Sequence, residues 1–283
     1  MNAIFLACAA IGISAQGVIK KYYSNKAEGR GVQIFGAVSV LFACLFFLFT
    51  SGFKLNFTAD VLPYTLGFAL SYGAATVTSF LSIKLGSLSL TSLISSYSLI
   101  IPTFFGLFFL DEEASVFFFI GLFLLLVSLF LINCKKSDVK ITLGWLVSVL
   151  IAFFSNGICS LCQNLQQRTF AGQYKNEFMI VALGSVFLTL LICSLFTERS
   201  DVAFCLKRGS HLMAMCGIAN GLVNLFVMIL ATRMNASIMF PVISAGGIIL
   251  SWSVSRFLYE ERLAAKQNLA LVSGIAAVVF MNL

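Results

Sequence analysis

Side-chain amides recur at helical spacing inside apolar stretches of this sequence. Asn156, Ser160 and Gln163 are separated by four and then three residues, and Asn220 and Asn224 by four. This spacing places the members of each set on one face of a helix. An amide donates and accepts hydrogen bonds without carrying a charge. These two faces therefore have the chemistry to bind the polar groups of a small molecule.

Two interpretations of the polar residues inside the apolar runs remain open. Serine stripes also let membrane helices pack closely, as does the spacing Gly217-x-x-x-Gly221. Asn and Gln are larger and harder to satisfy by packing alone, so we expect the amides to face a cavity. Tyr72, Tyr97 and Trp252 could stack on a ligand, although with 30 Phe in the chain packing is the alternative for any aromatic ring. The candidate substrate-binding residues are Gln16, Ser71, Tyr72, Ser96, Tyr97, Asn156, Gln163, Asn220, Asn224, Ser244 and Trp252.

Two prolines and one charged pair are candidate gating or structural residues. Pro102 and Pro241 each remove a backbone hydrogen bond from a helix, which leaves either a passive kink or a carbonyl free to bind a ligand. Arg256 and Glu260 are one helical turn apart. We expect them to pair at the end of a helix rather than to bind substrate.

Residues suited to acid–base, metal or redox chemistry are sparse. No Asp or Glu lies deep in an apolar run, and the single histidine, His211, lies at the edge of one. Cys159-x-x-Cys162 lies in the middle of a predicted helix with no second cysteine pair, so we interpret it as packing. The sequence therefore predicts a protein that is not an enzyme and that has no metal or other cofactor.

The composition is that of a membrane protein. Hydrophobic residues make up 60% of the chain and charged residues 10%, whereas a soluble domain is about half apolar and about a quarter charged. Lipid must therefore surround most of the chain. The net charge of +7 comes from short gaps between apolar runs and not from a basic stripe with interleaved aromatic residues. Membrane lipids are therefore expected partners, and nucleic acid is not.

Ten apolar runs are each long enough to cross a hydrocarbon core of about 30 Å. Along an open chain in lipid, only a helix satisfies its own backbone hydrogen bonds, so we predict an all-α integral membrane protein with ten transmembrane helices. The predicted helices are Ala3–Ile19, Val32–Thr50, Val61–Ile83, Leu88–Leu110, Ala114–Ile132, Ile141–Cys162, Phe178–Phe196, Leu212–Ala231, Ala236–Tyr259 and Leu263–Phe280.

The chain contains two copies of one unit. Residues 84–133 align without a gap with residues 233–282, at an offset of 149. In each copy a basic residue, Lys84 or Arg233, is followed 27 positions later by an acidic pair. Because each copy has five predicted helices, an odd number, the second must enter the membrane from the opposite side, as an inverted repeat. The predicted domains are a first repeat at 1–133, a basic linker at 134–140 and a second repeat at 141–283.

Lys and Arg are distributed unevenly between alternate gaps. Fourteen, Lys20 and Lys21 among them, lie in the gaps on one side of the predicted helices, and four lie on the other side. Cytoplasmic loops of membrane proteins are enriched in Lys and Arg, so the side with fourteen is predicted to be cytoplasmic. We therefore predict a multi-pass protein of the plasma membrane with both termini outside the cytoplasm.

These features together resemble the drug/metabolite transporter (DMT) superfamily, in its ten-helix EamA-like branch. Phe257–Leu263 is similar to the Leu-Gly-Glu-Arg-Leu signature of that family, and Leu110–Ala114 is a weaker match in the first copy. The resemblance covers the whole chain and implies an inverted repeat, a central cavity and alternating access for small metabolites. Two features differ from the family. Well-studied ten-helix members are drawn with cytoplasmic termini, and small multidrug members carry a carboxylate in the first helix, where this chain has Gln16.

The resemblance and the carboxylate-free polar faces predict a transporter, secondary-active or facilitative, that moves a small neutral or zwitterionic metabolite. One alternative is a flippase of a lipid-linked carrier, which would need a cavity open to the bilayer and a basic headgroup pocket. Another is a non-transporting membrane scaffold or receptor. The sequence leaves open the substrate's identity, the direction and coupling of transport, and whether the protein is a monomer or a homodimer.

Overall fold

The computed structural model describes residues 2–56, 58–110, 115–133, 142–259 and 265–280, and its regular elements within these ranges are all helices. The predicted all-α class is therefore confirmed. The helices of the first half are α1 (Asn2–Lys26), α2 (Val32–Thr50), η1 (Ala59–Val61), α3 (Leu62–Leu85), α4 (Leu88–Ser96), η2 (Tyr97–Leu99), α5 (Ile100–Phe109) and α6 (Val116–Asn133). Those of the second half are α7 (Leu143–Thr169), α8 (Lys175–Thr197), α9 (Val202–Ala231), α10 (Ala236–Leu258) and α11 (Ala265–Phe280).

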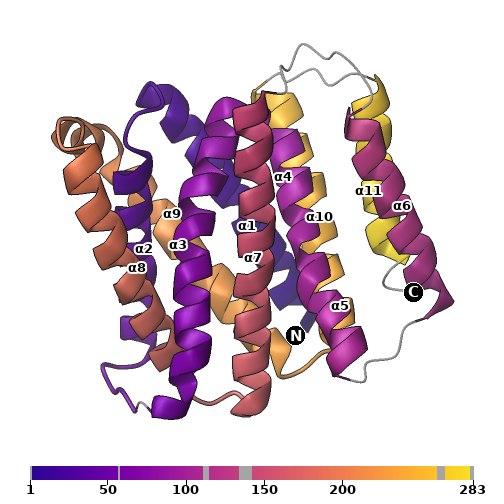
Figure 1. Ribbon diagram of the computed structural model, residues 1–283, viewed down its shortest axis with the longest axis horizontal. Coiled ribbons are helices and arrows are strands. Elements are labelled where there is room, and N and C mark those ends of the chain that lie inside the picture. The colour runs from indigo at the N-terminus through magenta and orange to yellow at the C-terminus, as the bar shows by residue number, and fades with distance from the viewer. Residues whose placement is uncertain (1, 57, 111–114, 134–141, 260–264, 281–283) are drawn as a thin grey trace.

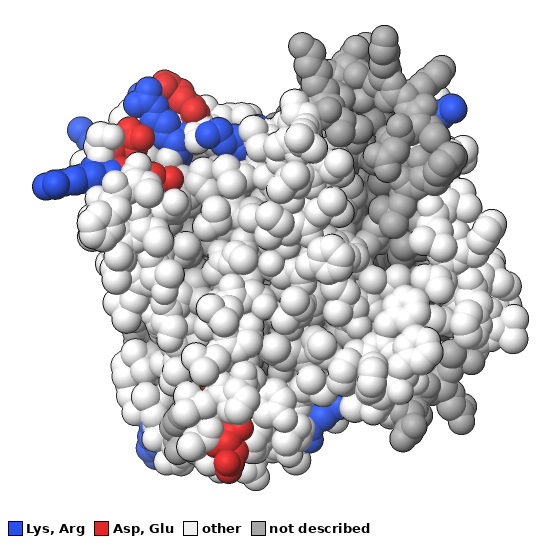
Figure 2. Space-filling model, viewed as in Figure 1, with Lys and Arg blue, Asp and Glu red and all other residues white. Residues whose placement is uncertain are grey.

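The surface and the helix lengths suit a lipid bilayer. Within the described residues, 7 helices are long and apolar enough to cross a membrane, namely α1, α2, α3 together with η1, α7, α8, α9 and α10. Large apolar side chains such as Phe108, Phe123 and Phe196 are exposed. Charged residues gather toward the upper left and the lower edge of Figure 2, and the described surface between them is largely uncharged. An apolar belt between charged ends is the surface expected of a protein surrounded by lipid.

The helices lie side by side in a bundle (Figure 1). α3 packs along α7, α1 packs along α9, and α2 packs along α8. α6 and α11 pack along each other and stand at the right of the view, where α11 also contacts α10 (Figure 1). α1 runs from the lower part of this view to its upper edge, and α11 runs back down.

The predicted helix Leu88–Leu110 is interrupted in the structure. It forms α4, the 3-10 turn η2 and α5 in place of one continuous helix. The physical reason is Pro102, which has no N–H to donate to the carbonyl of Ser98. That carbonyl instead lies beside Gly157 of α7, where a Cβ atom would be 2.8 Å from the oxygen. By contrast, α10 continues as one α-helix through Pro241.

Glycines also set the approach of α9 to α2. A Cβ atom on Gly217 would lie 2.7 Å from the Cβ of Phe42, and one on Gly221 would lie 2.6 Å from the ring of Phe46. Real Cβ atoms do not approach other carbons this closely, so the two helices are packed at a distance that only glycine permits. The packing interpretation of Gly217-x-x-x-Gly221 is confirmed.

Side chains from one helix stabilise the ends of others. The carboxylate of Glu198, which follows α8, accepts hydrogen bonds from the backbone N–H groups of Gln33 and Ile34 at 3.1 and 3.0 Å. These N–H groups belong to the first turn of α2 and have no partner within that helix. At the end of α3, the Nζ of Lys21 donates a hydrogen bond to the Gly86 carbonyl at 3.2 Å. The ends of α2 and α3 are therefore bonded to distant segments of the chain.

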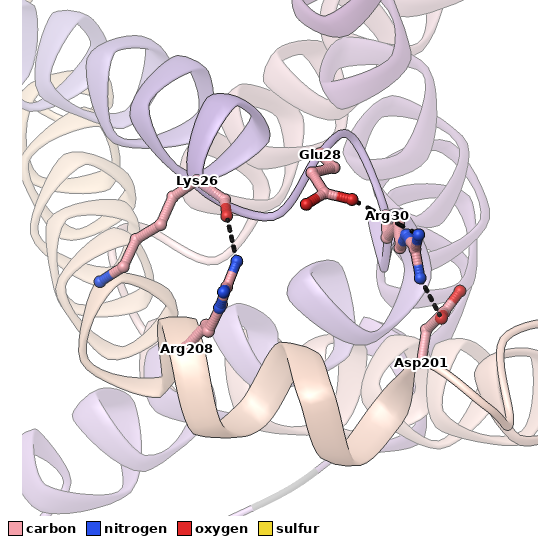
Figure 3. A network of polar contacts seen from close by, with 5 residues as sticks. All are labelled: Lys26, Glu28, Arg30, Asp201 and Arg208. Carbon is pink, nitrogen blue, oxygen red and sulfur yellow. Dashed lines mark hydrogen bonds and ion pairs between the residues drawn. The ribbon is translucent and has the colours of Figure 1, made fainter.

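Exposed charges link α9 to the turn between α1 and α2 (Figure 3). Arg30 lies 3.4 Å from Glu28 and 3.5 Å from Asp201, and the Nη1 of Arg208 donates a hydrogen bond to the Lys26 carbonyl at 3.3 Å. Exposed ion pairs of this kind stabilise a fold by about 0–1 kcal/mol each. These contacts therefore add little to the stability of this end of the bundle.

We predict that Gly157→Ala destabilises the protein by about 1–3 kcal/mol, because the added methyl group would press on the backbone of Ser98. Thermal unfolding of the purified protein in detergent measures the change. Gly184→Ala is the matched control, since no atom lies within 4 Å of a Cβ built on Gly184 of α8. Equal midpoints for the two variants would contradict the close approach of α7 to the break between α4 and α5.

Candidate functional site

A cavity of about 200 Å³ lies between α1, α3, α4, α7, α9 and α10. Its wall combines apolar side chains such as Phe68 and Phe240 with amides and hydroxyl groups. Seven of the eleven predicted substrate-binding residues line it, from five different helices. They are Gln16, Tyr72, Asn156, Gln163, Asn220, Asn224 and Ser244.

Asn220 is the centre of a hydrogen-bond network on the cavity wall. Its Oδ1 accepts from the Tyr72 hydroxyl at 2.7 Å and from the Nδ2 of Asn224 at 2.8 Å. Its Nδ2 donates to the Oε1 of Gln16 at 3.0 Å. The spacing that suggested one face for Asn220 and Asn224 is therefore correct, and that face meets α1 and α3.

Gln163 extends the network to α7. Its Nε2 donates to the Oδ1 of Asn224 at 2.6 Å. Gln163 and Asn224 are only 3% and 8% exposed, so their amides would be costly to leave unpaired. Side chains from α1, α3, α7 and α9 are thus bonded to one another through amides that a polar ligand can also use.

Asn156 lies two turns before Gln163 on α7 and lines the same cavity. Its Nδ2 donates to the Ala152 carbonyl at 2.8 Å and to the Ser79 hydroxyl of α3 at 3.5 Å. The Oδ1 atom of an amide remains an acceptor when Nδ2 donates, so Asn156 can contribute to ligand binding from a separate part of the wall.

Three hydroxyl residues of α4 and η2 line the cavity, and none of them is among the predicted substrate-binding residues. Thr91, Ser95 and Ser98 face it, whereas Ser96 was predicted and its side chain lies outside the described part of the structure. Their spacing of four and three residues was a usable signal, equal to that of Asn156, Ser160 and Gln163. Trp145 of α7 is 2% exposed and donates its Nε1–H to the Thr91 hydroxyl at 3.0 Å.

Lys20, which the sequence predicted to lie in a gap between two helices, is a charged residue of the cavity wall. α1 continues to Lys26, past the predicted end at Ile19, because the apolar run ends before the helix does. Lys20 therefore lies one turn after Gln16 on the same helical face, and both line the cavity. The spacing of four residues between Gln16 and Lys20 was the signal for this placement.

The remaining predicted residues lie elsewhere. Tyr97 is buried against α6 and α11, where its hydroxyl bonds with Ser128 at 2.6 Å, and Trp252 packs in the same apolar cluster. Ser71 is half-buried on α3 and is not among the residues that line the cavity. Pro102 is buried at the start of α5, and Arg256 is exposed on α10. Glu260 and the side chain of Pro241 lie outside the described residues, so the predicted pair of Arg256 with Glu260 remains a prediction.

The chain resembles solved structures in its fold, whereas no match in sequence was found. No family model matches the sequence, and no curated protein matches it. Among 28 solved chains that match in structure, a crystal structure of a protein superposes with a TM-score of 0.67. The match covers 96% of this chain and 98% of that chain at 14% sequence identity. This similarity shows that the two chains share a fold.

We predict that Gln163→Ala and Asn224→Ala are coupled by about 1 kcal/mol in a double-mutant cycle, because each removes one partner of the same buried hydrogen bond. Unfolding in detergent provides the four free energies. The control cycle combines Gln163→Ala with Asn156→Ala, which lie about 10 Å apart along α7 and should be additive within about 0.5 kcal/mol. Additivity of the first pair would show that the hydrogen bond between Gln163 and Asn224 contributes nothing to stability.

Proposed function

We propose that this protein is a transporter, secondary-active or facilitative, that moves a small polar metabolite across the membrane by alternating access. The observation that carries the proposal is the amide-lined cavity at the centre of a bundle of membrane-type helices. Small-molecule sites are concave and mostly apolar, with a few polar groups that converge on one place. The cavity of this protein fits that description.

We further propose the ten-helix inverted repeat of the DMT superfamily. The helix contacts support it. α3 of the first half packs along α7 of the second, and α9 of the second packs along α1 of the first. A two-fold operation that exchanges the halves would map each of these pairs onto the other, and would map the pairs α2 with α8 and α6 with α11 onto themselves. In transporters of this kind the substrate site lies between the repeats, which is where the amide network lies.

The charges support a membrane orientation. Lys26, Arg30, Lys84 and Arg208 lie at the helix ends that contain the α1–α2 and α3–α4 turns and the start of α9. This is the side to which the sequence assigns fourteen of the eighteen basic residues, and the positive-inside rule assigns it to the cytoplasm. We propose a plasma-membrane protein with its termini on the opposite side.

The size of the cavity supports a small substrate. About 200 Å³ is less than the ~300–1,000 Å³ of sites for drug-sized ligands. A lipid-linked carrier would need more room and an opening to the bilayer. A small polar metabolite, such as an amino acid or another compound of that size, fits better.

Uptake into proteoliposomes tests the proposal. For a metabolite that the wild-type protein transports, we expect Asn220→Ala and Tyr72→Phe each to reduce the transport rate by about tenfold or more. Each substitution removes a polar group that lines the cavity. Tyr97→Phe is the matched control. It also removes a buried hydroxyl hydrogen bond, but Tyr97 faces α6 and α11 and its loss should leave the transport rate of folded protein unchanged.

Two results would contradict this prediction. Equal transport by Tyr72→Phe and wild-type protein would remove the network from the substrate site. Failure of the wild-type protein to move any amino acid, nucleoside, sugar or organic acid of suitable size would overturn the proposed function itself.

A further inference from the structure

We propose that the substrate carries an anionic oxygen group, a carboxylate or a phosphate, and that the ammonium of Lys20 binds it. This inference rests on the proposed function and specifies the substrate class of the same cavity. It replaces the expectation of a neutral substrate, which depended on the absence of a fixed charge from the polar faces. A zwitterionic substrate agrees with this proposal only if Lys20 binds its anionic group.

Lys20 lies on the walls of two neighbouring spaces. It lines the central cavity and also an adjoining space of about 70 Å³ between α1, α2, α3, α7 and α9. Gln16, Tyr72, Asn156 and Asn220 line both spaces. Lys20 therefore borders both spaces, on the same walls as the amide network.

The described residues around Lys20 supply no opposite charge. Among the described residues that line either space, none is Asp or Glu. Within the described part of the chain, Lys20 makes no hydrogen bond or ion pair, whereas its neighbour Lys21 donates to the Gly86 carbonyl and Arg30 pairs with Asp201. An ionisable group inside a membrane protein is costly and marks a functional site by default. An anionic ligand would supply the counter-charge that the protein does not.

Hydrogen-bond donors line the same wall as Lys20. An ammonium offers three donors, and the Tyr72 hydroxyl and the amide groups of Asn156 and Asn220 are further donors on the same wall. Hydrogen bonds from donors to a charged oxygen are stronger than those to a neutral one. A carboxylate or phosphate group can therefore replace bonds within the network, while the apolar residues of the larger space contact the rest of the substrate. A cationic substrate would be repelled by Lys20.

Matched pairs of probes test the inference on the purified full-length protein. Thermal unfolding is followed with glycerol 3-phosphate against glycerol, with propionate against propionamide, and with inorganic phosphate and alanine as separate arms. A ligand that binds the folded state raises the unfolding midpoint by mass action. We expect an anionic member of a pair to stabilise the wild-type protein and its neutral partner not to do so. The carboxylate, phosphate and zwitterion arms then show which source of the anionic group the cavity accepts.

Variants at Lys20 give the second readout. We expect Lys20→Gln to weaken the apparent affinity for the anionic probe by about tenfold or more, and Lys20→Arg to retain most of it. Lys26→Gln is the control, because it removes the same charge from an exposed position on the same helix. If Lys20→Gln does not fold, Lys20→Arg and the matched pairs on the wild-type protein decide the question.

The possible failures are separable. If neutral compounds are bound or transported, and Lys20→Gln does not change this, the anionic substrate class is overturned while the proposed transport function stands. If no anionic probe stabilises the wild-type protein at any concentration, the anionic class is also overturned. Loss of the proposed function requires the separate result that the wild-type protein transports no compound of the wider metabolite set.

Discussion

Lipid offers no hydrogen bonds, and the arrangement of polar groups in this protein follows from that constraint. Hydroxyl groups inside the helices find partners in their own backbone: Thr65, Ser148 and Thr189 each donate to the carbonyl four residues earlier at 2.8–2.9 Å. Tyr97 bonds with Ser128, which in turn donates to the Ala270 carbonyl of α11 at 2.6 Å. Polar groups that are satisfied in this way hold helices together without any ligand.

The central cavity differs from these closed arrangements. Its amides from α1, α7 and α9 are bonded mainly to one another and to the Tyr72 hydroxyl of α3, so a polar ligand that enters can exchange bonds with groups from four helices. On the proposed mechanism, this exchange couples substrate binding to the positions of the helices. Movement of α9 relative to α1 would break the bond between Asn220 and Gln16, and movement relative to α7 would break the bond between Asn224 and Gln163. The same groups would then serve both binding and alternating access.

The two halves contribute unequally to this site. Asn156, Gln163, Asn220 and Asn224 all belong to the second half, whereas Gln16 and Lys20, the one charged residue among the described residues of the cavity wall, come from α1 of the first half. The helical segment that contains Pro102 is broken, and the one that contains Pro241 is continuous. Lys20 and the amides therefore line the same cavity, with Lys20 one helical turn from Gln16.

The sequence by itself determined the class of the protein and most of its helices, because hydrophobicity and spacing along the chain are local properties. The bounds of Val32–Thr50 were predicted correctly, and the spacing of Asn220 and Asn224 identified the face that lines the cavity. Only the tertiary structure decided which other faces meet there. The rotation of each helix depends on contacts with segments far away in sequence, such as Gly157 with the Ser98 carbonyl. In the folded protein Tyr97 faces α6 and α11, and the continuation of α1 places Lys20 on the cavity wall.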